Sequence, residues 1–178
     1  IWVKSAASVD GKIAMADGES QWITGPDARI DVQCLRARCQ AIVTGIDTVL
    51  IDNPRLTVRH QSAGILLPDE INASQPLRVI LDTHGRLPET GALFVADGPI
   101  LWITGSHFDH PLLHSGRVEQ WVAPLNNDRI DLQVVMSELA DRRINEVLVE
   151  AGPRLIGRCI TEELVDQGVL YLAPKLLG

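Results

Sequence analysis

The sequence predicts an α/β protein, and two observations lead to that class. Continuous apolar runs at residues 77–81 and 100–103 are typical of central strands that are buried on both faces. Segments of this kind alternate along the chain with segments of helical periodicity, as strands and helices do in an α/β sheet. A chain of 178 residues, with 46% apolar and 22% charged side chains, fits one globular domain over residues 1–178.

The first part of the chain predicts a strand, a helix and a second strand. Residues 1–8 form the first strand, and Asp10-Gly11 turns the chain. A helix begins at Thr24-Gly25-Pro26, where we expect Thr24 to supply a hydroxyl cap and the proline to lie in the first turn. We expect one apolar stripe of this helix to pack on the sheet, formed by Ala28, Val32, Leu35 and Cys39.

The rest of the chain continues the alternation. A strand at 41–44 leads into a turn or short helix at 45–50, which ends at Asn53-Pro54 because a residue before proline is pushed out of the helical region. Residues 60–75 have the composition of a surface loop. Beyond the two central strands we expect a strand at 118–122, a helix at 131–142, a strand at 147–149, a helix to about residue 163 and a last strand at 169–172.

Charge and cysteine usage argue against several classes of protein. The net charge of −7 disfavours nucleic acid and anionic membranes as partners, whereas a few local arginines suffice to bind a small anion. No apolar run approaches the roughly 20 residues of a membrane helix, and the first residues lack a signal-peptide pattern. Cys34, Cys39 and Cys159 have no metal-like spacing, so we expect free thiols and a cytoplasmic protein.

Histidines gather in one segment without predicting a metal site. His107, His110 and His114 surround a stretch that we interpret as an irregular loop, in which Pro111 interrupts helical geometry. The His-x-Glu and Pro-Cys-x-x-Cys motifs of zinc deaminases are missing from the sequence. We therefore expect no metal in this chain.

The junction after Val149 is the most informative local feature. A buried strand ends there, Gly152 and Pro153 make the turn, and a helix begins whose free amides and dipole favour a phosphate. Gly157 follows within the first turns of the helix. The alternative is an ordinary strand-to-helix connection, because neither the dinucleotide fingerprint nor a P-loop is present.

Several charged residues are candidates for a binding site. Arg36 and Arg59 could clamp a phosphate, although solvated surface charges are the alternative for both. Lys4 interrupts an apolar strand, so it either reaches solvent or donates a hydrogen bond in a site. Asp52 and Glu150 each follow a strand or turn, where the sites of α/β proteins gather, but capping carboxylates are common there too.

A family resemblance makes these candidates specific. The chain carries, in order, the blocks KSAASVDGK, GESQWIT, TVLIDNPRLTVR, VEAGP and APKLLG. Together they resemble the reductase domain of the bacterial riboflavin-biosynthesis deaminase/reductases, the RibD type. The resemblance implies a dihydrofolate-reductase-like fold, with a mostly parallel twisted sheet flanked by helices. It also implies reduction of 5-amino-6-(5-phosphoribosylamino)uracil to the ribitylamino compound, with hydride transfer from NADPH to C1′ of the sugar.

The resemblance also implies roles for individual residues. The groups nearest the sugar, and so the candidate catalytic residues, would be Lys4, Asp52 and Glu150. The substrate would contact Ser20, Arg36, Leu56, Arg59 and Glu150, with Ser20 and the two arginines on its phosphate. The cofactor would contact Ala6, Trp22, Thr48, Asp52, Thr83 and the segment of Gly152, Pro153, Arg154, Leu155, Ile156, Gly157 and Arg158. Thr83 stands where the family has serine, a change that keeps the hydroxyl.

The resemblance further implies that this chain is a fragment. The family continues with strands that complete the sheet and take part in a homodimer, and a zinc deaminase domain precedes the reductase domain. The alternatives are another reductase of the same fold, such as dihydrofolate reductase, and a module that binds NADPH without catalysis. The GESQW block argues against dihydrofolate reductase, and the phosphate-binding arginines argue against a module that binds only the cofactor.

Overall fold

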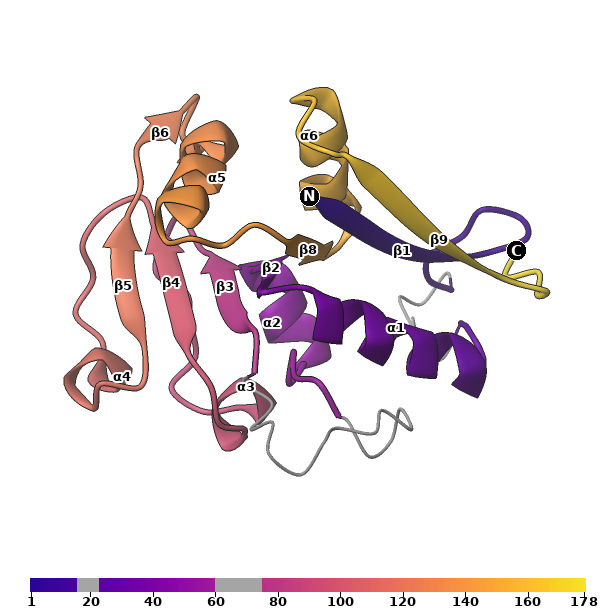
Figure 1. Ribbon diagram of the computed structural model, residues 1–178, viewed down its shortest axis with the longest axis horizontal. Helices are drawn as coiled ribbons and strands as arrows, with labels where there is room; N and C mark the ends of the chain where they lie inside the picture. Colours follow the sequence, from indigo (N-terminus) through magenta and orange to yellow (C-terminus); the bar gives the residue numbers. More distant parts are fainter. Residues whose placement is uncertain (16–22, 60–74) are drawn as a thin grey trace.

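The computed structural model describes residues 1–15, 23–59 and 75–178, and these residues form an α/β domain around one large sheet (Figure 1). The strands of this sheet are β1 (Trp2–Ser8), β2 (Ala41–Gly45), β3 (Leu77–Leu81), β4 (Ile100–Thr104), β5 (Glu119–Val122), β8 (Val147–Glu150) and β9 (Gln167–Ala173). Their order across the sheet is β5-β4-β3-β2-β8-β1-β9, and every neighbouring pair is parallel. The predicted α/β class is confirmed.

The helices connect these parallel strands. They are α1 (Pro26–Arg38), α2 (Ile46–Asp52), α3 (Ala92–Val95), α4 (Pro111–His114), α5 (Leu132–Asp141) and α6 (Pro153–Thr161). A two-stranded antiparallel hairpin, β6 (Leu125–Asn126) with β7 (Arg129–Ile130), precedes α5. The long helices and the strands of the large sheet lie close to their predicted ranges. The predicted loop at 60–75 lies almost wholly outside the described residues.

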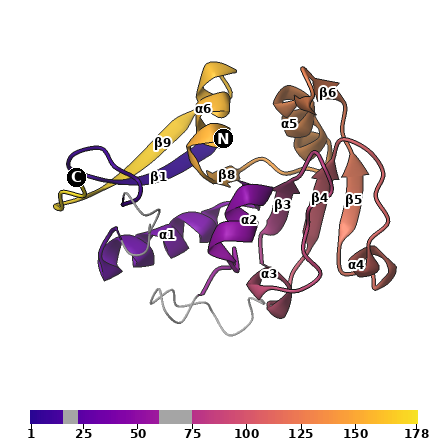
Figure 2. The same cartoon turned by 180° about the vertical axis from the view of Figure 1, so that it is seen from behind.

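The sheet is covered on both faces, so the domain has three layers. Helices α5 and α6 pack on one face against Val43, Val79 and Val149. The other face carries α2 and α3 against Ile42, Ile80 and Trp102, and α1 against Leu148. Views from opposite sides show α1 and α2 across the sheet from α5 and α6 (Figures 1 and 2). Because both faces are buried, the central strands are mostly apolar, as the sequence predicted, and Arg78 on β3 is a charged exception.

The start of α1 differs from expectation in one respect. Its N-cap is Gly25, no side chain accepts a hydrogen bond from its first turn, and Pro26 occupies the first position. The predicted Thr24 hydroxyl cap is therefore wrong, because the helix begins one residue later than that cap requires. By contrast, Asp131 does cap α5, accepting hydrogen bonds from the backbone amides of Gln133 and Val134.

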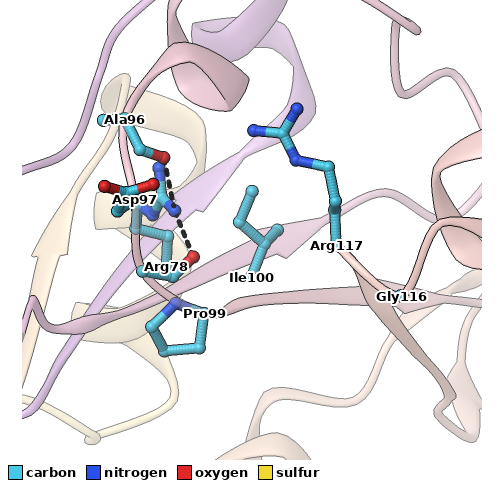
Figure 3. A pocket seen from close by; sticks show the side chains of 8 residues that line it. Arg78, Ala96, Asp97, Pro99, Ile100, Gly116 and Arg117 are labelled. Carbon is cyan, nitrogen blue, oxygen red and sulfur yellow. Dashed lines mark hydrogen bonds between the residues drawn. The ribbon is translucent and has the colours of Figure 1, made fainter.

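A buried arginine fixes the end of the sheet opposite the carboxyl ends of the strands. Arg78 on β3 has no exposed surface, and its guanidinium donates to the carbonyls of Leu93 and Gly98, both at 2.5 Å, and of Ala96 at 3.4 Å. Figure 3 shows this group beside Arg117, across a small pocket of about 210 Å³. Arg78 thus satisfies the carbonyls around α3, which no helical partner reaches, and its role is structural.

Candidate functional site

All the strands of the large sheet end at one edge, and the chemically useful side chains gather there. Strand β8 ends at Glu150 and helix α6 begins at Pro153, while β2 ends at Gly45 and α2 begins at the next residue. The carboxyl edge of a parallel sheet is where open α/β folds bind their ligands. The strand order therefore predicts a site spread over the ends of β1, β8, β2 and β3.

An ion pair between α1 and β8 anchors this site. The guanidinium of Arg36 binds both oxygens of Glu150, from Nε to Oε1 at 2.6 Å and from Nη2 to Oε2 at 3.0 Å. Its third nitrogen, Nη1, donates to the carbonyl of Thr57 at 2.9 Å. The two side chains are only 13% and 10% exposed. Arg36 therefore ties α1, β8 and the segment after α2 together.

Lys4 lies beside this ion pair. It pairs with Glu150 in the register of the adjacent strands β1 and β8, so the two side chains leave the same face of the sheet. On its other side the Lys4 ammonium lies 5.9 Å from the centre of the Tyr171 ring on β9. The Tyr171 hydroxyl donates to Asp31 of α1 at 2.7 Å, and burial is the largest cause of a raised pKa for this phenol. Lys4 thus has Glu150 as its neighbour on one adjoining strand, and its ammonium lies over the Tyr171 ring of the other.

The N-terminus of α6 fits the phosphates of a dinucleotide. Its N-cap is Gly152, which has no side-chain cap, so the amides of the first turn have no partner from a capping side chain. A Cβ built on Gly152 would meet no atom within 4 Å, so the space above this turn is open. An uncapped helix start with open space suits an anion. The role predicted for the segment from Gly152 to Arg158 stays a prediction, and the open, uncapped helix start is the feature that supports it.

A cleft of about 570 Å³ runs from this helix start along the edge of the sheet. Within the described ranges it is lined by Gly45, Ile46, Asp47, Leu81, Thr83, His84, Arg86, Asp128, Arg129, Ile130, Arg154, Leu155 and Arg158. Four of these residues are arginines and two are aspartates, although the whole chain carries a net charge of −7. The cleft is therefore a local basic region suited to an anionic ligand.

The turn after β3 forms the far wall of the cleft and is held firmly in place. The Gly105 amide donates to the carbonyl of Thr83 at 3.2 Å, and a Cβ on Gly105 would lie 3.1 Å from that carbonyl oxygen. Asp82 accepts from the Trp102 indole at 3.0 Å within the core. Gly85 has φ +69° and packs directly under the Phe108 ring, where a Cβ would collide with the ring. Thr83 and its neighbours are therefore presented on a rigid turn.

Other predicted site residues take varied positions. Thr48 is half-buried on α2. Asp52 is mostly exposed at the end of this helix, and desolvation of the part that is covered raises the pKa of its carboxyl. Among the described residues Asp52 makes no hydrogen bond with Lys4 or Glu150. The Leu56 side chain is only 3% exposed, within the apolar core, and its φ is +51°, so only its backbone can face a ligand. Arg59 is exposed.

The remaining predicted positions complete this comparison. Ala6 lies half-buried on β1, opposite Tyr171 of β9. Ser20 and Trp22 lie outside the described residues. The structure thus brings together Lys4, Glu150 and Arg36, and separately gathers Thr83 with the start of α6 around the cleft.

The sequence analysis missed several residues at this edge. Asp47, His84, Arg86 and Arg129 line the cleft, and Tyr171 lies under Lys4. The signal for His84 and Arg86 was present, because both follow directly on the apolar run of β3 at a strand end. Nothing in the local pattern marked Tyr171, which reaches Lys4 only through the pairing of β1 with β9.

The segment interpreted as an irregular loop contains the short helix α4, in which His110 is the N-cap and Pro111 takes the first position, because proline is tolerated in a first helical turn. In the parts of the chain that the structure describes, no three His, Cys, Asp or Glu side chains gather as metal ligands would. His110 is buried with its Nε2 atom 3.0 Å from the carbonyl of Leu87 and its ring 5.3 Å from that of Trp102. The three cysteines are free thiols. Across residues 1–15, 23–59 and 75–178, no helix has the length and apolar character needed to span a bilayer.

Comparison with known proteins gives consistent matches over the whole chain. A family model described as the RibD C-terminal domain matches residues 1–178. The chain is 41% identical over 182 residues to the riboflavin biosynthesis protein RibD of Escherichia coli, covering all of this chain and 49% of that protein. It is 42% identical over 181 residues to RibD of Haemophilus influenzae, covering all of this chain and 48% of that protein. The chain thus spans about half the length of the curated relatives it matches.

Solved structures agree with these sequence matches. One form of Acinetobacter baumannii RibD matches with a TM-score of 0.81 and 38% identity, over 99% of this chain and 46% of that one. A Thermotoga maritima protein matches with a TM-score of 0.79 and 29% identity, over 99% of this chain and 45% of its own. That protein is described as a diaminohydroxyphosphoribosylaminopyrimidine deaminase and 5-amino-6-(5-phosphoribosylamino)uracil reductase.

Proposed function

This chain belongs to the RibD C-terminal domain family, and from that membership we propose that it is an NADPH-dependent reductase of riboflavin biosynthesis. Its substrate is 5-amino-6-(5-phosphoribosylamino)uracil, which it reduces to the 5-phosphoribitylamino compound. The observation that carries the proposal is that Lys4 pairs with Glu150 at the end of β8, three residues before the uncapped start of α6, whose first residues line the cleft. The reacting sugar and a dinucleotide can therefore meet at one edge of the sheet. The domain spans residues 1–178 and acts in the cytoplasm, in a homodimer of chains that also carry a zinc deaminase domain.

The start of α6 supports the cofactor assignment. The cofactor supplies the hydride that adds to C1′ of the ring-opened imine of the sugar. The amides of Arg154 and Leu155, in the first turn of the uncapped helix α6, and the dipole of that helix would hold the pyrophosphate. Arg154, Leu155 and Arg158 of this segment line the cleft together with Thr83. Thr48, Ala6 and the rest of Gly152–Arg158 are further cofactor contacts in this proposal. Asp52 and Trp22 complete the predicted cofactor contacts.

The polar cluster supports the proton transfer that balances the hydride. Reduction of the C=N bond adds hydride to C1′ and a proton to the nitrogen. Both oxygens of Glu150 are occupied by Arg36, so Glu150 fixes the cluster rather than giving up a proton. The Lys4 ammonium carries donor protons, so we assign it the role of proton donor, directly or through a water. Asp52 remains a candidate for the same role.

The substrate phosphate is assigned to Arg59 and Arg36. Arg59 is exposed on the segment that follows Leu56. The Nη1 atom of Arg36 lies beside the carbonyl of Thr57 in the same segment, to which it donates a hydrogen bond. Ser20 is the third predicted phosphate contact, and the backbone of Leu56 is the fourth substrate contact. Guanidinium groups suit phosphate oxygens because they can bind two at once.

A matched pair of glycine variants tests the cofactor site. Gly152 and Gly25 are each the N-cap of a helix that begins with proline, and their φ/ψ angles are −71°/172° and −74°/178°. A Cβ added at either glycine would have no other atom within 4 Å. Gly152→Ala and Gly25→Ala should therefore cost similarly little stability. We expect NADPH affinity, measured by fluorescence titration, to fall only in Gly152→Ala. Equal affinities in the two variants would contradict the placement of the pyrophosphate.

The activity itself is tested by NADPH absorbance decay in the full-length protein. We expect oxidation with 5-amino-6-(5-phosphoribosylamino)uracil and none with dihydrofolate. Lys4→Met should abolish turnover while NADPH binding is kept. A protein that binds NADPH but oxidises it with neither substrate would be the non-catalytic module instead.

A further inference from the structure

Lys4 is the proton donor in the proposed function, yet no ionic partner holds its ammonium in the folded chain. Its neighbour in the register of β1 and β8, Glu150, gives both carboxylate oxygens to Arg36. Within the described residues the ammonium makes no hydrogen bond or ion pair, and the interaction that remains to it is with Tyr171, 5.9 Å from the centre of the ring. The four-carbon stem of a lysine is flexible, so the ammonium depends on this contact for its position.

The pairing of β1 with β9 places this ring beside the lysine. Lys4 pairs with Val169, and Tyr171 lies two residues further along β9, on the same face of the sheet. Directly opposite Tyr171 is Ala6, whose methyl group is too short to cover the ring. The stem of Lys4 can therefore lean along the strand and place its ammonium over the ring face, where the negative potential of the π system attracts a cation.

Helix α1 fixes the ring as well as the ion pair on the other side of Lys4. The Tyr171 hydroxyl donates to Oδ2 of Asp31 at 2.7 Å, and Arg36 of the same helix binds Glu150. This one helix thus holds the neighbours of Lys4 on both adjoining strands, β9 and β8. Burial, ahead of the hydrogen bond to Asp31, raises the pKa of the phenol, so the hydroxyl keeps its proton and the ring stays neutral.

We propose that Tyr171 is a positioning residue of the reductase, whose ring holds the Lys4 ammonium in the orientation that delivers a proton to the imine nitrogen. The inference rests on the proposed function, with Lys4 as its proton donor. The ammonium gives one proton to the nitrogen as hydride adds to C1′, and the neutral amine then takes a proton back from water.

The alternative makes the Tyr171 hydroxyl itself the proton donor. That hydroxyl already donates its single proton to Asp31. The Lys4 ammonium has three protons and, among the described residues, no acceptor for any of them. The geometry therefore favours Lys4 as the donor and Tyr171 as its support.

Single turnovers of the full-length protein test the proposal, with NADPH oxidation by 5-amino-6-(5-phosphoribosylamino)uracil followed in a stopped-flow instrument. Tyr171→Leu removes the ring, and the rate constant at saturating substrate should fall about three- to thirtyfold, the range that the loss of one cation–π contact allows. The half-saturating substrate concentration and the NADPH affinity should not change, because the ring orients the ammonium and binds neither ligand. Tyr171→Phe keeps the ring face and should retain the rate constant within about twofold. Val169→Ala is the matched control: it alters the same face of β9, at the residue paired with Lys4, and should keep the wild-type rate constant.

A further variant keeps the shape of the side chain and changes the electrons of the ring, so the test does not depend on whether Tyr171→Leu folds. It carries 3,4,5-trifluorophenylalanine at position 171, whose fluorines draw electron density from the ring and remove most of its attraction for a cation. Its rate constant should fall below that of Tyr171→Phe by about the factor that separates Tyr171→Leu from the wild type. A ring that only packs against its neighbours would give equal rate constants in the two variants.

Four results would overturn the role of Tyr171 while the reductase proposal stands. These are an unchanged rate constant in Tyr171→Leu, equal rate constants with phenylalanine and its trifluoro analogue, a loss in Val169→Ala as large as in Tyr171→Leu, and a loss in Tyr171→Phe as large as in Tyr171→Leu. The last of them would make the hydroxyl the proton donor instead. If the wild type binds no NADPH, or oxidises none with this substrate, the proposed function itself fails and this inference fails with it.

Discussion

Replacing Glu150 with glutamine should remove more stability than any change to a surface charge of this protein. The substitution leaves the Arg36 guanidinium without a counter-charge while the group stays 13% exposed. Breaking a buried pair from one side costs about 3–5 kcal/mol. Glutamine keeps the size of the side chain and one accepting oxygen, which preserves one of the two hydrogen bonds to Arg36. We therefore expect a loss of about 3 kcal/mol, or roughly 6–12 °C in Tm for a domain of this size.

Urea unfolding followed by circular dichroism measures this loss, and two further variants define its cause. Asp47→Asn breaks the Arg86 pair, whose side chains are 47% and 52% exposed, and should cost about 1 kcal/mol or less. The double variant Arg36→Met/Glu150→Gln removes the orphaned charge and should recover at least about 1 kcal/mol relative to Glu150→Gln alone.

The reasoning would be refuted by a small effect or by additivity. If Glu150→Gln is no less stable than Asp47→Asn, the burial of the pair does not control its energy. If the double variant is no more stable than Glu150→Gln alone, the uncompensated Arg36 charge is not the cause of the loss, and the ion pair does not join α1 to β8 as described.

Three further predictions concern other parts of the molecule. Arg78→Met should lower the free energy of unfolding by about 3 kcal/mol or more, because it leaves three carbonyls without donors, and urea denaturation would measure this. Burial raises the pKa of the Cys39 thiol to about 11, so in native protein Cys39 should react with iodoacetamide far more slowly than the half-buried Cys34. In urea the two cysteines should react at similar rates. Mass spectrometry of timed samples measures both rates, and equal rates in native protein would contradict the prediction. A hydrogen bond from Ser8 holds the pKa of the Asp10 carboxyl below its ordinary value, so the stabilisation from this carboxylate is present at neutral pH and is lost as the pH falls through the lowered pKa. The backbone amides of residues 177 and 178 donate to this carboxylate, so their hydrogen exchange should rise on acidification. In Asp10→Asn that exchange should not depend on pH once intrinsic exchange is corrected for.

The fold was predictable where a segment is long enough to show its period. The strands β3 and β4 and the helices α1 and α5 follow from apolar runs and stripes of four apolar residues each. The short elements α3, α4 and the β6–β7 hairpin were missed, because two to four residues carry no detectable periodicity. The cap of α1 was misplaced because Thr24 and Gly25 are both acceptable N-caps in sequence, and the backbone at Pro26 decides between them.

The site was predictable only where position along one strand sufficed. Glu150 and the start of α6 could be identified because strand ends are favoured places for ligands. The partnership of Glu150 with Arg36 joins residues 114 positions apart, so no spacing rule could find it. The same holds for Arg86 and Asp47, which meet only because β2 and β3 are neighbours in the sheet.

The Arg36–Glu150 pair also changes how the expected phosphate clamp must work. The family resemblance implies that Arg36 and Arg59, with the Ser20 hydroxyl, bind the substrate phosphate. In the folded chain Arg36 already gives Nε and Nη2 to Glu150 and Nη1 to the Thr57 carbonyl, so only its remaining N–H groups can reach a ligand. Arg59, exposed two residues beyond Thr57, keeps its fork available. Because Arg36 donates to the carbonyl of Thr57, it holds the segment that carries Arg59. In the proposed clamp Arg36 would therefore position Arg59 and add only its remaining N–H groups to the phosphate.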